Sequence, residues 1–191
     1  MAAGRLMRSG ASIQALLDDL VDFNRTLLGL GVKVVPSDID LAAEVADEVE
    51  QLRGAYPDRQ IELAVTGSNH GRWDGARFKQ MLRNLVSNAI NYGSPNTLVR
   101  VALRGEEAEV RLEVTNSGSP IDPLTVSQMF HPLQRGSAQD YSRDSRSNLG
   151  LGLFIVREIV NAHGGKIDVQ SDEGETTCVV RLPRRSPGAP P

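Results

Sequence analysis

The sequence predicts a two-layer α/β sandwich, in which a mixed, mostly antiparallel sheet packs on three helices, with a further helix in front. The composition is that of a globular domain, because 40% of the 191 residues are hydrophobic and 24% are charged. Stretches with a helical period and stretches with a period of two follow one another in the order β-α-β-β-loop-α-β-β. The turn at residues 104–107 joins two of these strands as a hairpin, which favours antiparallel pairing.

Charge and composition exclude several classes of function. The net charge of −3 gives no electrostatic basis for nucleic-acid binding. No apolar run approaches the length of a membrane span, and no signal peptide is visible, so we expect a cytoplasmic protein without membrane contact. Cys178 is the only cysteine and cannot form an intramolecular disulfide; we expect it to be buried on a strand.

The first 30 residues predict a separate helical unit. Residues 1–10 are expected to fray, and a helix is predicted over residues 12–28. At helical spacing, the apolar residues of this stretch share one face: Ile13, Leu16, Leu17, Leu20, Phe23 and Leu27. The polar face is formed by Gln14, Asp18, Asp22 and Arg25. A helix with such an apolar face needs a partner, either in its own domain or in a helical bundle.

The remaining chain is divided into a linker (31–39), a domain (40–184) and a disordered tail (185–191). Asp38 or Asp40 is predicted to cap a helix over residues 41–54, and Asp74 to cap a long second helix. Strands are predicted over residues 60–65, 98–103, 109–114, 166–170 and 176–182, and a third helix over residues 149–163. Residues 67–71 read as a turn, and residues 134–147 as a mobile loop that could close over a site.

The long helix that follows Asp74 carries an unusual row of amides. Its apolar stripe is formed by Phe78, Met81, Leu82, Leu85, Val86 and Ala89. Beside that stripe lie Gln80, Asn84, Asn88 and Asn91, which are neighbours at helical spacing. Asparagine is a mediocre helix former, so the row requires a reason. It is either a solvated polar face or a set of carbonyl oxygens suited to a hard cation.

Two further stretches favour a phosphate-binding function. Gly150 and Gly152 interrupt an apolar run, NLGLGLFIV, where it turns into a helix. A glycine turn at a helix N-terminus offers free N–H groups to phosphate. The stretch Asn116 to Ile121 directly follows an alternating strand, where an ordinary strand-ending turn is the alternative. The three stretches in this order form a joint signal for a site that binds a metal ion and phosphate.

These motifs resemble the catalytic, ATP-binding part of bacterial sensor histidine kinases, whose fold is shared with gyrase, the large heat-shock chaperone and MutL. The resemblance runs from about Leu41 to Pro183, and the front helix is similar to the second helix of the family's dimerisation domain. The four boxes of the family match residues 84–93 (asparagine box), 116–121 and 148–153 (glycine boxes) and 130–132 (phenylalanine box).

The resemblance implies ATP and Mg²⁺ as ligands and assigns roles to residues. Asn88 would hold the metal, while Asn84 and Arg135 would act in catalysis, Arg135 at the γ-phosphate. The residues implied in cofactor binding are Asn88, Asn91, Tyr92, Asn116, Gly118, Ile121, Phe130, Asn148, Leu149, Gly150, Leu151, Gly152 and Leu153. Arg143 and Arg146 are further lid cations, each of which could equally be a solvated charge. An amide at position 84 cannot take a proton, so direct hydrolysis of ATP is expected to be poor.

Several positions depart from the family's pattern. Asn116 replaces an aspartate that accepts a hydrogen bond from the adenine amino group, and retains a carbonyl oxygen for that purpose but not the charge. Asn91 stands where the family often has a cation. Asn148 replaces a glycine, in a turn that asparagine tolerates better than other side chains.

The resemblance implies partners as well: a phosphoacceptor histidine domain, a response regulator receiver domain, and a second copy bound through the front helix. None of His70, His131 and His163 lies on the front helix, so the phosphoacceptor is expected to be in a missing segment or supplied in trans, and no self-phosphorylation is expected. Two alternatives remain, a serine kinase of the anti-sigma type and a non-catalytic nucleotide-sensing module.

Overall fold

A single mixed sheet and the helices that cover one of its faces form the body of the protein. The computed structural model describes residues 2–133 and 150–185, with side chains at residue 14 and from residue 16 onward. The elements follow in the order α1 (Ala2–Leu27), β1 (Ser37–Asp40), α2 (Leu41–Ala55), β2 (Ile61–Thr66), β3 (His70–Trp73), α3 (Gly75–Tyr92), β4 (Val99–Gly105), β5 (Glu109–Ser117), α4 (Pro123–Gln128), α5 (Gly152–Ala162), β6 (Lys166–Asp172) and β7 (Glu175–Pro183).

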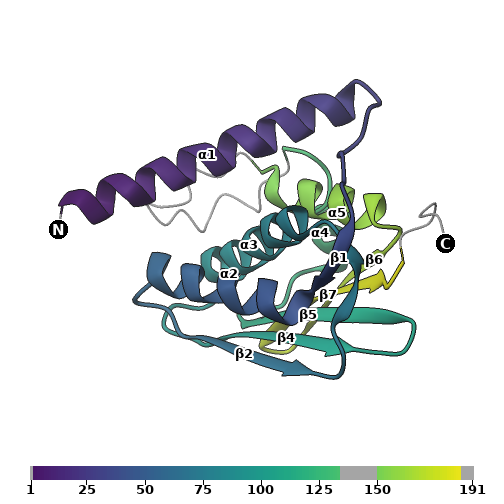
Figure 1. The fold of residues 1–191 in the computed structure, drawn as a ribbon. Helices are drawn as coiled ribbons and strands as arrows, with labels where there is room; N and C mark the ends of the chain where they lie inside the picture. The colour runs from purple at the N-terminus through teal and green to yellow at the C-terminus, as the bar shows by residue number, and fades with distance from the viewer. Residues whose placement is uncertain (1, 134–149, 186–191) are drawn as a thin grey trace.

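The main sheet has the strand order β2-β4-β5-β7-β6. Only β2 and β4 run parallel, and the other neighbours are antiparallel. Figure 1 shows α2, α3 and α5 together on one side of this sheet, with α1 lying across them on the side away from the strands. The predicted two-layer sandwich with a helix in front is therefore confirmed.

Buried and solvent-accessible residues alternate along the central strands, and this explains why the helices cover one face of the sheet. On β5, Val110, Leu112 and Val114 are at most 2% exposed, whereas the residues between them are partly open to solvent. The predicted stripe of α3 packs onto this face, and all six of its apolar residues are at most 4% exposed. Burial of large aliphatic side chains contributes about 1.5–3 kcal/mol each, so this contact fixes α3 on the sheet.

Both predicted helix caps at the start of α2 and α3 are present. The Asp40 carboxylate accepts from the Ala42 N–H, and the Asp74 carboxylate accepts from the Arg77 N–H. Asp40, and not Asp38, therefore begins α2. A cap of this kind stabilises a helix by about 1 kcal/mol and fixes its first residue.

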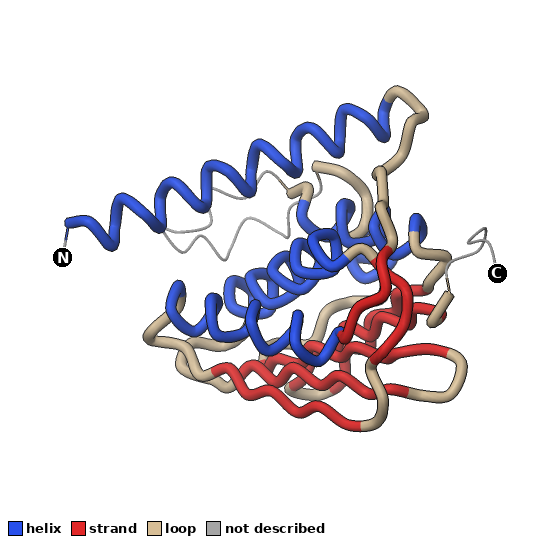
Figure 2. The backbone as a smooth tube through the Cα atoms, viewed as in Figure 1, coloured by secondary structure: helices blue, strands red, loops and turns tan. Residues whose placement is uncertain are grey.

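Two strands lie where the sequence predicted none. β1 falls within the stretch predicted as a linker, and β3 overlaps the predicted turn at residues 67–71. They pair antiparallel with each other beside the main sheet (Figure 2), and Arg72 of β3 also forms an isolated bridge with Arg185. Neither is long enough to show a period of two, and long-range pairing alone makes them strands.

At the two ends of the described chain, α1 begins earlier than predicted and Arg184 contacts the body of the domain. Residues 1–10, which were expected to fray, contribute the start of α1, from Ala2 onward. Arg184, the last residue of the predicted domain, donates from its guanidinium to the carbonyls of Ser68, His70 and Glu106. Residues 186–191 lie outside the described part of the chain.

The front helix turns part of its polar face, and not most of its apolar face, toward the rest of the chain. Asp22 of the predicted polar face is 1% exposed, and Asp19 is 8% exposed. Leu17, Leu20 and Leu27 of the predicted apolar face are 52%, 41% and 66% exposed, which leaves the partner expected for that face open. Polar partners on α3 decide this orientation. Among the described residues, no helix combines the length and the apolar character that crossing a membrane requires.

Candidate functional site

The polar edge of α3 forms one wall of the candidate site. Asn84, Asn88 and Asn91 are half-buried along this edge, beside the fully buried apolar stripe. Asn88 is half-buried and, within the described part of the chain, makes no side-chain hydrogen bond. The core stripe thus sets the direction in which the amide row points.

Asn84 joins this wall to the first turn of α5. Its Nδ2 lies 3.4 Å from the carbonyl oxygen of Gly152. A Cβ added to Gly152 would lie 3.6 Å from the Asn84 Cγ, which is ordinary contact. Two motifs that are 68 residues apart in the sequence are therefore neighbours in space.

The N-terminus of α5 has the geometry of an anion cradle. Gly150 has φ +69°, a left-handed conformation that glycine adopts without strain. Leu151 is the N-cap residue and makes no side-chain cap hydrogen bond, and Gly152 begins the helix. Leu151 thus offers no side-chain acceptor to the first N–H groups of α5, which carry the positive end of the helix dipole.

At the other end of the amide row, α3 meets the end of β5. The Nδ2 of Asn116 donates to the carbonyl of Ser117 at 3.3 Å, which leaves its Oδ1 as an acceptor. Glycines surround this amide: a Cβ on Gly93 would lie 3.1 Å from the Nδ2 and one on Gly118 3.5 Å from it. A Cβ on Gly93 would also lie 2.4 Å from the Ala89 carbonyl, so only glycine fits there.

The structure adds Thr176 to this end of the site, which sequence reasoning missed. Thr176 of β7 is paired with Asn116 of β5, so both side chains lie on the helix-covered face. Its hydroxyl is 3.0 Å from that of Ser171, which accepts from the Ile121 N–H at 2.9 Å. A buried threonine on an otherwise apolar strand face was the available signal.

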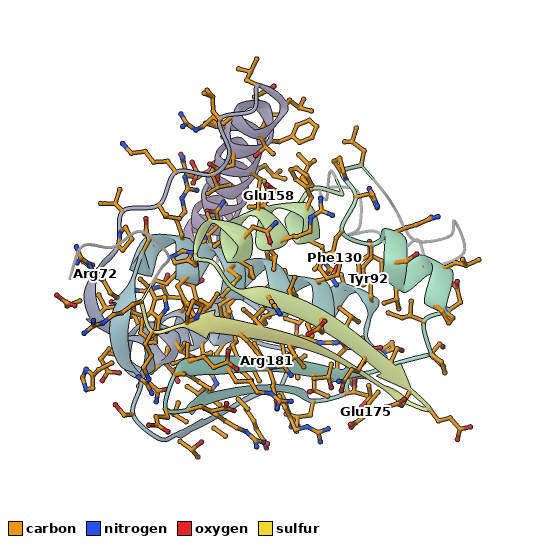
Figure 3. The ribbon with its side chains drawn as sticks, turned by 90° about the vertical axis from the view of Figure 1, so that its right-hand side faces the viewer. Arg72, Tyr92, Phe130, Glu158, Glu175 and Arg181 are labelled. Carbon is orange, nitrogen blue, oxygen red and sulfur yellow. The ribbon has the colours of Figure 1, made fainter. Side chains whose placement is uncertain are left out.

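Tyr92 and Phe130 border the site on its open side. Figure 3 shows both on the side of the molecule that carries α4. Tyr92 is 54% exposed, so it does not pack into the core, and Phe130 is half-buried. Leu153, in the first turn of α5, is packed against the core. The predicted site residues Arg135, Asn148 and Leu149, together with Arg143 and Arg146, lie outside the described residues.

Two buried titratable groups lie beside the site helices. Burial raises the pKa of Asp19, against the hydrogen bonds of Gln80 and Asn84. Burial lowers the pKa of His163, whose Nδ1 donates to the Ile159 carbonyl and whose Nε2 accepts from the Asp74 N–H. His163 is therefore a neutral link between the end of α5 and the start of α3.

Comparison with known proteins identifies the class to which this fold and site belong. Residues 73–186 match the family described as histidine kinase-, DNA gyrase B-, and HSP90-like ATPases. This match covers more than half of the chain, and the chain therefore belongs to that ATPase family.

Curated relatives within the family are sensory proteins. The chain is 34% identical to a bacteriophytochrome of Pseudomonas aeruginosa, with 93% of this chain and 24% of the relative aligned. It is 32% identical to the probable sensor histidine kinase TcrY of Mycobacterium tuberculosis, over 95% of this chain and 38% of the relative. The chain thus spans between a quarter and two-fifths of the length of these relatives.

Solved structures agree with the fold. The catalytic domain of the histidine kinase ThkA superposes with a TM-score of 0.68 at 24% identity, covering 81% of this chain and 98% of that one. The Acinetobacter baumannii histidine kinase AdeS superposes with a TM-score of 0.72 at 19% identity, covering 94% and 82%. At these identities the likeness establishes the fold.

Proposed function

We propose that this chain is the ATP- and Mg²⁺-binding catalytic part of a two-component sensor histidine kinase, with a helix of the dimerisation domain at its N-terminal end. In this assignment residues 1–30 belong to the dimerisation unit, residues 31–39 connect, and residues 40–184 bind the nucleotide. The contact between Asn84 and Gly152 is the observation that supports it most directly, because it brings the amide row and the glycine turn together.

The residues present fit a magnesium nucleotide. The left-handed turn at Gly150 and the uncapped start of α5 suit a polyphosphate, with Leu151, Gly152 and Leu153 offering backbone N–H groups. Asn88 offers one oxygen to Mg²⁺, which prefers oxygen ligands and retains several waters. Asn116, Gly118, Ile121 and Thr176 would bind the base, where the open Oδ1 of Asn116 accepts from an exocyclic amine.

Mg²⁺, when bound, supplies charge neutralisation for transfer of the γ-phosphoryl group. Asn84 cannot accept a proton, so this chain does not activate water at that position. The γ-phosphoryl is thereby preserved for a histidine on another segment, and Arg135 is the cation proposed to stabilise the transferring group. Tyr92, Asn91 and Phe130 close the open side of the site.

The partners proposed are a phosphoacceptor histidine domain, a response regulator receiver domain and a second copy of the chain, in the cytoplasm. A solved ThkA structure that resembles this chain is a complex with a response regulator. The exposed leucines at the end of the front helix support the dimer, because the described part of the chain leaves Leu17, Leu20 and Leu27 of α1, and Leu28 just after it, open to solvent.

Calorimetry with ATP in the presence and absence of Mg²⁺ tests the proposed site. Gly150→Ala forces an alanine into φ +69°, and we expect at least tenfold weaker binding of Mg·ATP. Gly164→Ala is the matched control, because Gly164 has φ +71° at the opposite end of α5. If the wild-type chain binds no nucleotide at millimolar concentration, the chain is a non-catalytic module and the proposal is wrong.

Phosphotransfer is tested by mixing the chain and ATP with a separately made histidine-bearing helical hairpin. We expect acid-labile phosphate on the hairpin and none on this chain alone. Acid-stable phosphate on a serine would instead support a serine kinase.

A further inference from the structure

The front helix is held on the site helix α3 by polar contacts, while Phe23 of its apolar face packs against α5. The Asp22 carboxylate accepts from both terminal nitrogens of Arg77, with the Nη2 to Oδ1 distance at 2.9 Å. The Gln80 amide donates to Asp19 at 3.0 Å and to Asp22 at 3.2 Å. Arg77 also donates to the Gln80 Oε1 at 2.7 Å, so four side chains form one network. We call these four residues the acidic latch.

Beyond the latch, the described side chains of α1 also contact α5. Phe23 meets Phe154 of α5 edge to face, with 5.7 Å between ring centroids. A groove of about 420 Å³ remains between α1 and α3, lined in part by Asp18, Val21 and Lys79. When α1 moves away, water can hydrogen-bond to the polar groups that it leaves. No such replacement exists for the apolar side chains that α3 buries on the sheet.

Asp19 is the unusual member of the latch. It is 8% exposed and accepts a hydrogen bond from the neutral Gln80 amide, and it lines one groove together with Asn84 and Arg83. A buried carboxylate without a close cation is unfavourable. The docked helix therefore brings an incompletely compensated negative charge to the side of α3 that carries the amide row.

The latch is continuous with the candidate nucleotide site. Arg77, Gln80 and Asn84 follow one another at intervals of three and four residues, so they share one face of α3. Asn84 contacts Gly152 in the first turn of α5, the proposed anion cradle. Asp19 is thus one side chain away from the position proposed for the phosphates, and a carboxylate there repels a bound polyphosphate.

We propose that the acidic latch couples the front helix to the nucleotide site, so that docked α1 and a bound nucleoside triphosphate disfavour each other. The inference rests on the proposed function, because it places the triphosphate at Asn88 and Gly150. Coupling between two binding events is reciprocal. Release of α1 therefore tightens nucleotide binding by the same factor by which the nucleotide promotes release of α1.

Two measurements on the full chain test the coupling. Amide hydrogen exchange over residues 19–27 reports the docking of α1, and calorimetry reports the affinity for Mg·ATP. In Asp22→Asn we expect faster exchange of α1 without nucleotide and at least about fivefold tighter Mg·ATP binding. In the wild-type chain, Mg·ATP is expected to speed exchange of the same residues.

Asp18→Asn is the matched control, because Asp18 is exposed on the same helix and the charge change is identical. It is expected to leave both readouts unchanged, and an equal tightening in this variant would show a long-range charge effect and overturn the latch. Phe23→Ala loosens α1 without removing a charge, and it is also expected to tighten Mg·ATP.

Unchanged affinity in Asp22→Asn or Phe23→Ala, although exchange shows that α1 is released, contradicts the coupling while leaving the proposed function intact. Absence of nucleotide binding in the wild type and both variants instead contradicts the proposed function, and with it the coupling. Circular dichroism of each variant establishes that the sheet and the remaining helices are folded before either result is read.

Discussion

The two sides of α3 show how one helix can be held permanently on one neighbour and reversibly on another. Toward the sheet it presents six apolar residues that are at most 4% exposed. Toward α1 it presents Arg77 and Gln80, which bind carboxylates. Apolar burial has no equivalent in water, whereas a charged contact can be replaced by hydration at modest cost. The sheet side therefore fixes the site, and the α1 side is free to regulate it.

The largest expected effect lies on the sheet side of α3. Leu82 is 0% exposed, so Leu82→Ala removes buried methyl groups and leaves a cavity in the core. We expect a loss of about 2–5 kcal/mol in the free energy of unfolding. Urea denaturation followed by circular dichroism measures it, and a loss below about 1 kcal/mol would show that this contact is less tightly packed than the structure indicates.

A smaller effect is expected on the opposite side of the same helix. Asp22→Asn removes a charge-assisted contact with Arg77, for which about 1.5–3 kcal/mol is typical. Because α1 can move away and expose both groups to water, we expect this loss in the docking of α1 rather than in the global unfolding of the sheet. Hydrogen exchange separates the two, and parallel loss of protection in β5 and β7 would contradict local release.

His163, which links the end of α5 to the start of α3, makes the stability of the folded core sensitive to acid. Its pKa is lowered from the ordinary value of 6.5 by burial, with Asp74 and Arg77 as the charged groups that face it. The folded state thus favours the neutral ring, so this contribution to stability is complete above pH 6.5 and is lost as the pH falls toward the lowered pKa. Protonation of Nε2 also removes the acceptor for the Asp74 N–H, and a hydrogen bond of this kind contributes about 1 kcal/mol.

The measurement is the free energy of unfolding between pH 5 and pH 7.5 in the wild type and in His163→Gln. The wild type is expected to lose stability on the acid side relative to the variant. Identical pH profiles would mean that His163 does not titrate on unfolding in this range.

Asp19 is expected to have the smallest effect, on the docking of α1. Its pH dependence is opposite to that of His163, because its contribution is lost as the pH rises. Its pKa is raised above the ordinary value of 3.8 by burial, among Gln80, Asn84, Asp22 and Arg83. The contribution of its protonated form to docking is therefore complete below that ordinary value and is lost as the pH rises through the raised pKa. Asp19→Asn should dock as well as or better than the wild type at neutral pH.

Exchange rates of α1 in wild type and Asp19→Asn, compared from pH 4 to pH 7, test this. The wild-type helix is expected to loosen with rising pH relative to the variant. If Asp19→Asn loosens α1 as much as Asp22→Asn does, the carboxylate of Asp19 stabilises docking in its charged form. The expected difference between Asp19 and Asp22 is then wrong.

The sequence by itself determined the elements with a strong period, and it pointed to the residue types of the candidate site. The stripe of α3, the alternation of β4, β5 and β7, and the Asp40 and Asp74 caps depend on residues that are near in sequence, so local spacing is sufficient. The amide row and the glycine turn were visible for the same reason, as residue types that fit poorly in an ordinary helix.

Tertiary structure alone decided the orientation of α1, the pairing of β1 with β3, and the place of Thr176. Periodicity put Asp22 in solvent, but the bidentate contact with Arg77, 55 residues away, buries it and leaves the leucines exposed. β1 and β3 are too short to show an alternating pattern in the sequence. They form strands because the backbone groups of each are hydrogen-bonded by the other. In each case the deciding partner is distant in the chain, and no local pattern can specify it.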